Sequence, residues 1–278
     1  MGTTERTQHL VKTAPLTAYF GLLVIGTYVF VAVFADIIAP YSETAVLGAE
    51  YEPWGGEYIL GTDNLGRDML SRLIYGARNT VGIAFITTAL AFLLGCGMGI
   101  VAATLGGWVD QVLSRFVDVM LSIPQLVFAL LVLTIVGTSV INLILVISIL
   151  YAVVIFRLAR AVSQGVVVMD YLEAARLRGE GLWWIITKEI LPNIMAPLVA
   201  EFGLRFCFVF LLISALSFLG LGIQPPTADW GSMVRENATL ITFGDPTPLL
   251  PALAIALLTV AVNFVVDWML HRASGLKS

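Results

Sequence analysis

Six long apolar runs, separated by polar segments, organise this chain. An α-helix needs about 20 apolar residues to cross the hydrocarbon core of a bilayer, and most of the runs are close to that length. The runs have weak periodicity because they are apolar on all sides, as expected of helices that face both lipid and protein. The pattern predicts an all-α membrane protein with six transmembrane helices. These lie near Leu16–Ala39, Val81–Leu105, Val117–Val136, Val140–Phe156, Pro197–Leu221 and Leu249–Leu270.

The first run lies where a signal peptide would lie. It is longer than the roughly 7–15 apolar residues of a signal h-region, and no convincing small-residue cleavage site follows it. We therefore predict that it stays in the protein as a transmembrane anchor. The predicted parts are an N-terminal segment (1–15), a first transmembrane helix (16–40), a loop with an amphipathic helix (41–78), a five-helix core (79–271) and a tail (272–278).

The positions of Lys and Arg predict the side of the membrane on which each loop lies, because cytoplasmic loops carry an excess of these residues. With the N-terminus in the cytoplasm, the inner segments hold ten Lys or Arg residues and the outer segments hold four, while Arg205 lies within a span. Three of the outer four lie in the long loop 41–78, where the rule is weaker. The sequence predicts that both termini and residues 171–192 are cytoplasmic, and that the loop 41–78 is periplasmic.

The loop 41–78 opens irregularly and ends in the block LGTDNLGRDMLSRLIYGAR, residues 60–78. Asp63 or Asn64 is suited to cap a short helix there. Apolar and polar residues then fall on opposite helix faces. The apolar face holds Met69, Leu70, Leu73, Ile74 and Ala77, and the polar face holds Arg67, Asp68, Ser71, Arg72 and Arg78. This pattern predicts an amphipathic helix on the outer membrane surface. It is either a simple interfacial helix or a docking surface for a partner.

A second polar segment, EAARLRGEGLWWIITKEILP at residues 173–192, separates the fourth and fifth apolar runs. It is longer than most connections between helices. Its first six residues favour a helix, which Gly179 and Gly181 then break. A second helix, Leu182–Leu191, is expected to end at Pro192, because proline cannot continue a helix without losing a hydrogen bond.

The side chains of this segment allow two interpretations. Trp183 and Trp184 fit the belt of aromatic residues at a membrane surface, and Glu173 is favoured at a helix start by the helix dipole. Ala174 and Ala175 leave a shallow helix face. The segment is either an amphipathic surface turn or a helix that docks into a groove of another protein.

Two pairs within the apolar runs are also informative. Gly95 and Gly99 have the GxxxG spacing that lets helices approach closely in lipid. Glu201 and Arg205 are four residues apart and share a helix face, although a charge at mid-bilayer costs about 2.5–3.5 kcal/mol. Such residues usually face a bundle interior or a wet cavity. The second pair is either an ion pair near the cytoplasmic interface that locks the helix, or a charged lining of a translocation path.

Composition and candidate chemistry exclude several classes of protein. Charged residues make up 12% of the chain, against about 25% in a soluble domain, so lipid is the main solvent. Cys96 and Cys207 lie inside apolar runs, and His9 and His271 have no ligand-spaced companions, so no disulfide or metal site is predicted. No Walker loop, Ser-His-Asp set or paired-carboxylate site is present. We predict no catalytic residue and no cofactor in this chain, which counts against a membrane-embedded enzyme.

A multi-pass membrane protein without a catalytic site is a candidate transporter, whose energy would come from a neighbouring protein or from an ion gradient. A self-sufficient secondary transporter needs its own ion-coupling site and usually an internal repeat, and neither is found in the sequence.

The second polar segment resembles the EAA loop of permease subunits in binding-protein-dependent ABC importers. The likeness rests on Glu173-Ala174-Ala175, Gly179 and Ile190-Leu191-Pro192. Further blocks resemble the C-type subunit of the peptide/nickel/opine permease family. They are residues 60–78, SRFVDVMLSIPQLVFALL (114–131), RLARAV (157–162) and LSFLGLGIQPPTADWGSMV (216–234). Two features depart from that family: Pro251-Ala252 stands where Pro-Gly is usual, and the C-terminus lacks the common acidic ending.

The resemblance implies a type I ABC importer permease fold in a bacterial or archaeal cytoplasmic membrane. It implies a cytoplasmic coupling helix in the coupling loop 171–192, made by Tyr171, Glu173, Ala174, Ala175, Arg176, Leu177, Arg178 and Gly179. It also suggests that a solute-binding protein docks near Arg67, Arg72, Asp229, Trp230 and Arg235. The implied partners are a B-type permease subunit, two ATPase subunits that carry ATP and Mg, a periplasmic or lipid-anchored binding protein and membrane lipid, with no nucleic acid. Peptides are the default substrate, with opines, nickel chelates and glycosides left open.

Overall fold

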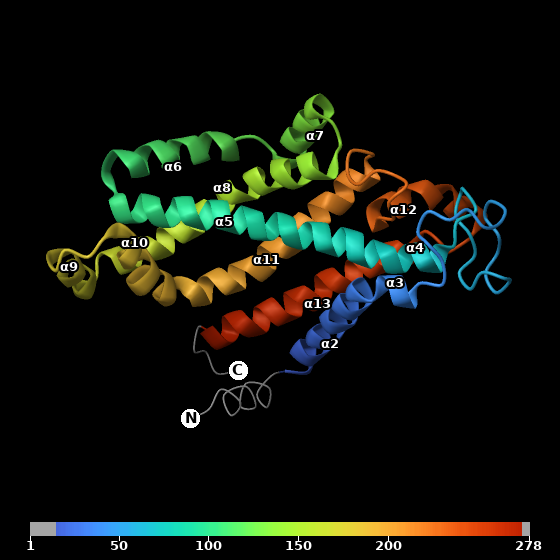
Figure 1. Cartoon of the computed structure of the whole chain (residues 1–278), viewed down its shortest axis with the longest axis horizontal. Helices are drawn as coiled ribbons and strands as arrows, with labels where there is room; N and C mark the ends of the chain where they lie inside the picture. The colour runs from blue at the N-terminus through green and yellow to red at the C-terminus, as the bar shows by residue number, and fades with distance from the viewer. Residues whose placement is uncertain (1–14, 274–278) are drawn as a thin grey trace. The chain divides into compact units, whose positions relative to one another are not determined.

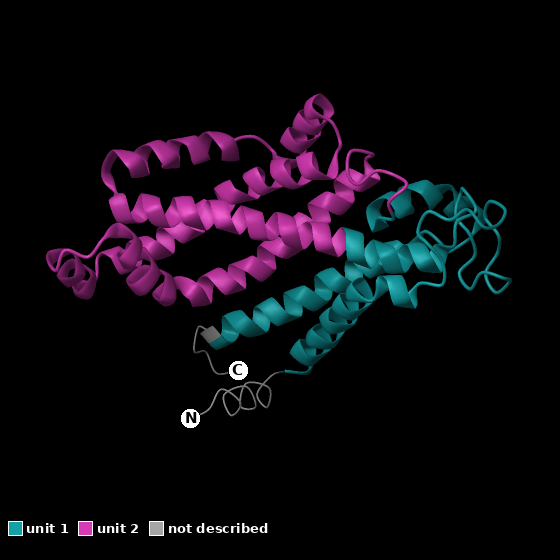
Figure 2. Cartoon of the chain, viewed as in Figure 1, with its two compact units in different colours: residues 1–79, 228–278 teal, residues 80–227 magenta. Residues whose placement is uncertain are grey.

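The computed structural model describes residues 15–273, so the predicted N-terminal segment 1–15 and tail 272–278 lie almost entirely outside the described residues (Figure 1). The described residues form helices and two isolated β-bridges, with no strand. The chain divides into two compact units (Figure 2). One unit holds residues 1–79 and 228–278, and the other holds residues 80–227.

The unit of residues 80–227 is a sequence of helices joined by short turns. They are α5 (Gly82–Leu105), α6 (Gly107–Leu121), α7 (Gln125–Val136), α8 (Val140–Val167), α9 (Asp170–Leu177), α10 (Leu182–Trp184), the π-helix η2 (Ile185–Ile190) and α11 (Leu191–Phe218).

The other unit combines the first and last parts of the chain. Its helices are α2 (Leu16–Val33), α3 (Ala35–Ile38), α4 (Met69–Gly76), α12 (Trp230–Asn237), the 3₁₀-helix η3 (Ala238–Phe243) and α13 (Leu249–Ala273). The π-helix η1 (Ala77–Val81) continues the chain from α4 into α5.

Five helical stretches in the described residues are long and apolar enough to cross a membrane. They are Leu16–Val33, Met69–Leu105, Val140–Val167, Leu182–Phe218 and Leu249–Arg272. Helices α6 and α7 pass the same test only as a pair, and together they raise the number to six. The predicted all-α membrane fold is confirmed.

The third predicted span, Val117–Val136, is wrong as a single straight helix. Helix α6 ends at Leu121, α7 begins at Gln125, and the two are bent by 88° at this break. Pro124 explains the bend, because proline lacks a backbone N–H and disfavours the helical conformation in the residue before it. Its own backbone, with φ −56° and ψ 122°, is not helical. Hydropathy alone does not reveal such a break.

Helices α5 and α8 pack closely along one another (Figure 1). A Cβ atom on Gly95 would lie 2.5 Å from the carbonyl oxygen of Ala152, and one on Gly99 would lie 2.9 Å from Cβ of Ala159. Gly97, between them, has open space around it. The two glycines at GxxxG spacing therefore face the neighbouring helix, as the sequence predicted.

Helices α2 and α13 pack against one another in the same way within their own unit. Gly21 approaches the backbone of Ala261, so that an added Cβ would lie 2.5 Å from its carbonyl oxygen. The hydroxyl of Tyr28 donates a hydrogen bond to the carbonyl of Ala254 at 3.1 Å. A small residue and a hydrogen-bonded tyrosine thus lie in the contact between two mostly apolar helices.

Candidate functional site

Helix α9 carries the predicted coupling residues. Asp170 and Glu173 lie in its first turn and Arg176 in its last, the arrangement that the helix dipole favours. The helix ends in a Schellman motif: Glu180 N–H donates to the carbonyl of Ala175, and Gly179 N–H to that of Arg176. Gly179 has φ +80°, a conformation that a side chain disfavours. The glycine of the EAA pattern is therefore favoured by the backbone conformation at the end of α9.

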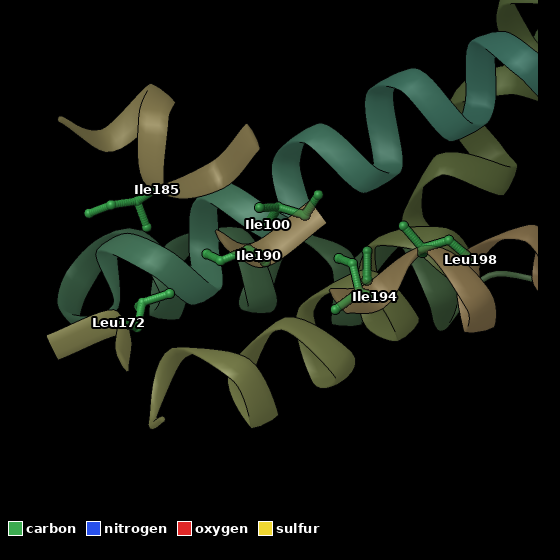
Figure 3. Packing of buried hydrophobic residues seen from close by; sticks show 7 residues of the cluster. Ile100, Leu172, Ile185, Ile190, Ile194 and Leu198 are labelled. Atoms are coloured by element: carbon green, nitrogen blue, oxygen red, sulfur yellow. The ribbon is translucent and has the colours of Figure 1, made fainter. Parts of the chain in front are cut away.

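The inner face of α9 is anchored by apolar packing. Leu172 and Ala175 are fully buried. Leu172 belongs to a cluster that draws on α5, α8, η2 and α11 (Figure 3). The cluster consists of Ile100, Ala159, Leu172, Ile185, Ile190, Ile194 and Leu198. This packing fixes the short helix to three long helices and to the π-helix η2.

The outer face of α9 is open and mixed in character. Tyr171, Glu173, Ala174 and Arg178 are exposed, and the side chain of Leu177 is 83% exposed. Among the described residues, no ion pair or side-chain hydrogen bond involves Glu173. This face of α9 therefore presents an apolar side chain and an unpaired carboxylate, and it is open to another protein.

Two of the predicted coupling residues contact the rest of the unit, although one of them, Arg176, is itself exposed. Ala175 is buried, and the guanidinium of Arg176 donates a hydrogen bond to the backbone carbonyl of Thr104 in α5 at 3.1 Å. The predicted set therefore separates into outward residues and residues that attach α9 to the rest of its unit.

The helix after the glycines does not end at Pro192, so that prediction is wrong. The chain is helical from α10 through η2 into α11, and Pro192 lies in the first turn of α11. The π-helical stretch shifts the hydrogen-bond pattern just before the proline. Since a first-turn residue has no essential N–H partner, proline is tolerated there.

Glu201 and Arg205 form an ion pair near the middle of α11. Arg205 Nε lies 2.5 Å from Glu201 Oε1, and the two side chains are 19% and 13% exposed. The Arg205 guanidinium also lies over the ring of Phe208, 5.3 Å from its centre. The pair is formed as the spacing predicted, but it is far from either end of its helix. Both interpretations of its role remain predictions.

The block of residues 60–78 contains a buried network of charges. Arg67 lies 2.7 Å from Asp63, and Arg72 lies 3.2 Å from the same carboxylate oxygen. Glu236 of α12 is 3.3 Å from both guanidinium groups. Asp63, Arg67 and Arg72 are at most 3% exposed. We call these four residues the buried ion network. Glu236 lies 164 residues from Arg72, and no local sequence signal marks it as a partner.

The start of α4 also differs from the prediction. Asp68 caps the helix by accepting from the backbone N–H of Ser71 at 2.8 Å, so neither Asp63 nor Asn64 is the cap. Asp63 instead accepts from the backbone N–H of Leu65 and Arg67 and from the arginines. Four residues of the predicted polar face are therefore buried in the protein, namely Arg67, Asp68, Ser71 and Arg72. The fifth, Arg78, is exposed and pairs with Asp36 at 2.8 Å.

The residues predicted to dock a binding protein are mostly buried. Asp229 caps α12 by accepting from the backbone N–H of Ser232. Trp230, 2% exposed, lies against Gly76 and donates to the carbonyl of Leu73 at 3.0 Å. Burial argues against direct docking by Arg67, Arg72, Asp229 and Trp230, because they offer no surface to a partner. Arg235 is exposed.

The described residues hold no group of three or more His, Cys, Asp or Glu side chains that could bind a metal. The arrangement combines apolar spanning helices, a short charged helix with one anchored and one open face, and an irregular loop with buried charges. It defines a multi-pass membrane protein with one helix face open to a partner.

Comparison with known proteins identifies the family. Residues 95–273 match the model for the binding-protein-dependent transport system inner membrane component. The chain is 32% identical over 252 residues to the dipeptide transport system permease protein DppC of Alkalihalophilus pseudofirmus, covering 90% of this chain and 83% of that protein. It is 36% identical over 254 residues to the di/tripeptide permease protein DppC of Pseudomonas aeruginosa, with coverages of 89% and 84%. It is 30% identical over 262 residues to the glutathione permease protein GsiD of Pectobacterium atrosepticum, with coverages of 94% and 85%.

The chain therefore belongs to the family of binding-protein-dependent transport system inner membrane components. It is a permease subunit of an ABC importer, and its resemblance to C-type peptide permeases is confirmed. These relatives are named as transport permeases, not as enzymes. A self-sufficient secondary transporter is not favoured.

Proposed function

We propose that α9 is the coupling helix through which an ATPase subunit drives this permease to import peptides. The observation that carries the proposal is the open face of α9: Leu177 and Glu173 are exposed on a helix whose opposite face is buried in its unit. Tyr171, Ala174 and Arg178 complete this face. A helix that is fixed to the rest of its unit transmits a displacement applied to its exposed face. A loosely attached helix would move by itself.

The proposed assembly supplies what this chain lacks. Two ATPase subunits bind ATP and Mg, a B-type permease subunit completes the path through the membrane, and a periplasmic or lipid-anchored binding protein delivers the solute. In this arrangement both termini and α9 are cytoplasmic, in a bacterial or archaeal membrane. Closure of the ATPases moves α9 and switches the spans between inward-open and outward-open states. This coupling requires that the contact with α9 differ between the two states.

Peptides are the proposed substrates. The support is that relatives covering most of this chain are named for dipeptides, di- and tripeptides and glutathione. Uptake of radiolabelled dialanine by cells, with and without the gene for this chain, tests the substrate class. Equal uptake by both strains would contradict a dipeptide substrate and would favour the other solutes of the family.

The binding protein is proposed to dock on exposed parts of the unit that holds α4 and α12. Arg235 is retained from the original prediction because it is exposed. Trp54 and Ile59, in the loop before α4, are exposed apolar residues and are better placed for contact than the buried ion network. Their substitution by Ser is expected to weaken binding-protein association.

The coupling role is tested by Leu177→Asp in the purified complex. A charge at the centre of a docked apolar contact is expected to cost about 2 kcal/mol or more, which is about 30-fold in affinity. The measurement is the amount of ATPase that co-purifies with the permease. Ile59→Asp, at a similarly exposed apolar position, is the matched control and should retain the ATPase. Retention by both variants would exclude α9 as the docking site.

A further inference from the structure

The corner between α5 and α6 is held by two arginines from other helices. Helix α5 ends at Leu105, and Gly106 and Gly107, with φ +62° and +55°, turn the chain into α6. The last four carbonyl groups of any α-helix have no partner within the helix. Such a corner needs outside groups to fix it.

Arg176 of α9 provides one of these groups. Its Nη2 atom donates to the carbonyl oxygen of Thr104, in the last turn of α5, at 3.1 Å. A cation at this position also interacts favourably with the negative end of the α5 dipole. Because the acceptor is a backbone carbonyl, a displacement of Arg176 acts directly on helix α5 rather than on a flexible side chain.

Arg160 of α8 provides the second group. Its guanidinium makes a two-pronged ion pair with Asp110 in the first turn of α6, with Nη2 2.5 Å from Oδ2 and Nε bonded to Oδ1. Paired contacts of this kind fix orientation as well as distance. The corner is therefore attached to α8 on the α6 side and to α9 on the α5 side.

Apolar packing strengthens the same connection. Leu172 of α9 and Ile100 of α5 belong to one buried cluster (Figure 3). A displacement of α9 thus reaches α5 through the Arg176 hydrogen bond and through the apolar cluster that the two helices share. Arg178, two residues after Arg176, is exposed like Arg176 but makes only a long ion pair of 3.9 Å with Glu180.

We propose that Arg176 is a positioning residue that transmits the movement of α9 to the α5–α6 corner, while Arg160 and Asp110 make the corner move as one body. This inference rests on the proposed coupling role of α9 and assigns different tasks to its two faces. The outward residues Glu173 and Leu177 hold the ATPase. Arg176 passes the movement inward and contributes little to ATPase binding.

The test uses the reconstituted complex of both permease subunits and the ATPases in lipid nanodiscs, with a binding protein loaded with dialanine as the stimulus. Arg176→Met removes the donor and keeps the aliphatic stem, and Arg178→Met is the matched control. For Arg176→Met we expect unchanged ATPase association and a loss of stimulated ATP hydrolysis of about tenfold, a typical size for coupling between sites. Arg178→Met should retain the stimulation.

Two further variants distinguish a loss of transmitted movement from a loss of folding stability in the permease. Arg176→Lys keeps a charged donor for the Thr104 carbonyl and should recover most of the stimulation. Asp110→Asn weakens the ion pair with Arg160 and should lower the stimulated ATP hydrolysis with ATPase association unchanged. This variant still tests the inference if the Arg176→Met complex fails to assemble. Each variant is also assayed for ATP consumed per dialanine transported, which rises only when transmission is impaired.

Three results would overturn the inference. They are full stimulation in Arg176→Met, an equal loss in Arg178→Met, and a loss of ATPase association in Arg176→Met that matches its loss of stimulation. The last result would make Arg176 a docking residue. Normal ATPase association in Leu177→Asp is a separate result, since it removes the proposed coupling site rather than the role of Arg176 within it.

Discussion

Two short segments of this chain look alike in sequence and differ in structure. Residues 60–78 and residues 173–180 are both charged, punctuated by glycine and able to form a short helix. In the first segment Arg67 and Arg72 are buried and paired with carboxylates of the same chain. In the second, Glu173 is exposed and has no side-chain partner among the described residues.

The difference identifies which charges are available to another molecule. Charges that are satisfied inside the chain are committed to holding it together, because removal of one partner leaves the other buried and unpaired. Exposed charges contribute little to stability. Charge pattern alone therefore does not distinguish a docking surface from an internal brace, whereas the presence or absence of partners does.

The largest effect should follow from breaking the buried ion network. Asp63→Ala leaves Arg67 and Arg72 with one carboxylate instead of two, so we expect a loss of about 3–5 kcal/mol in the free energy of unfolding. Unfolding by SDS titration of the purified subunit measures it. Glu57→Ala, at an exposed position in the same loop, should change the value by less than about 0.5 kcal/mol. Similar values for both would show that the network does not hold the loop.

A smaller effect is expected where α12 meets α4. A Cβ atom on Gly76 would lie 2.5 Å from the Trp230 ring, so Gly76→Ala should cost about 1–3 kcal/mol through overpacking. Gly82, six residues later, has open space around it, and Gly82→Ala should be neutral or slightly stabilising. The same SDS titration compares the two. A neutral Gly76→Ala would mean that the indole moves aside without cost.

The fold could be predicted from the sequence because hydropathy and length decide which helices cross a membrane. Five spans needed only apolar runs. The bend at Pro124 was missed because the longer stretches before and after it are mostly apolar, so composition hides a break that backbone sterics impose. At Pro192 the error was the reverse, because a helix end was predicted where the helix continues. The π-helical stretch before it accommodates the proline at the start of α11.

The site was less predictable, because side-chain partners are set by contacts far apart in the chain. The EAA pattern located α9, but it did not separate Glu173, which faces outward, from Arg176, which binds the backbone of Thr104 72 residues away. In the same way, Arg67 and Arg72 had the pattern of a solvated face until Glu236 was found between them.

Glu201 and Arg205 are an intermediate case that sharpens the comparison. They are paired, but their side chains are 13% and 19% exposed. If the pair acts as an internal brace, Arg205→Gln should cost about 1–2 kcal/mol in the SDS titration, between the values for exposed and buried pairs. The relative uptake of dialanine and trialanine should stay unchanged. A changed preference with unchanged stability would instead identify the pair as lining of the translocation path.

The smallest effect on stability, and the most direct test of the contrast, is expected at Glu173. Because this carboxylate has no side-chain partner among the described residues, Glu173→Ala should change the free energy of unfolding by less than about 0.5 kcal/mol. The same variant should reduce the amount of ATPase that co-purifies with the permease, because a docked partner would pair with the charge. Glu50→Ala, another exposed carboxylate without a side-chain partner in the described residues, should alter neither measurement. If Glu173→Ala destabilised the subunit as much as Asp63→Ala, exposure and the lack of a side-chain partner would not identify charges that are available to another protein.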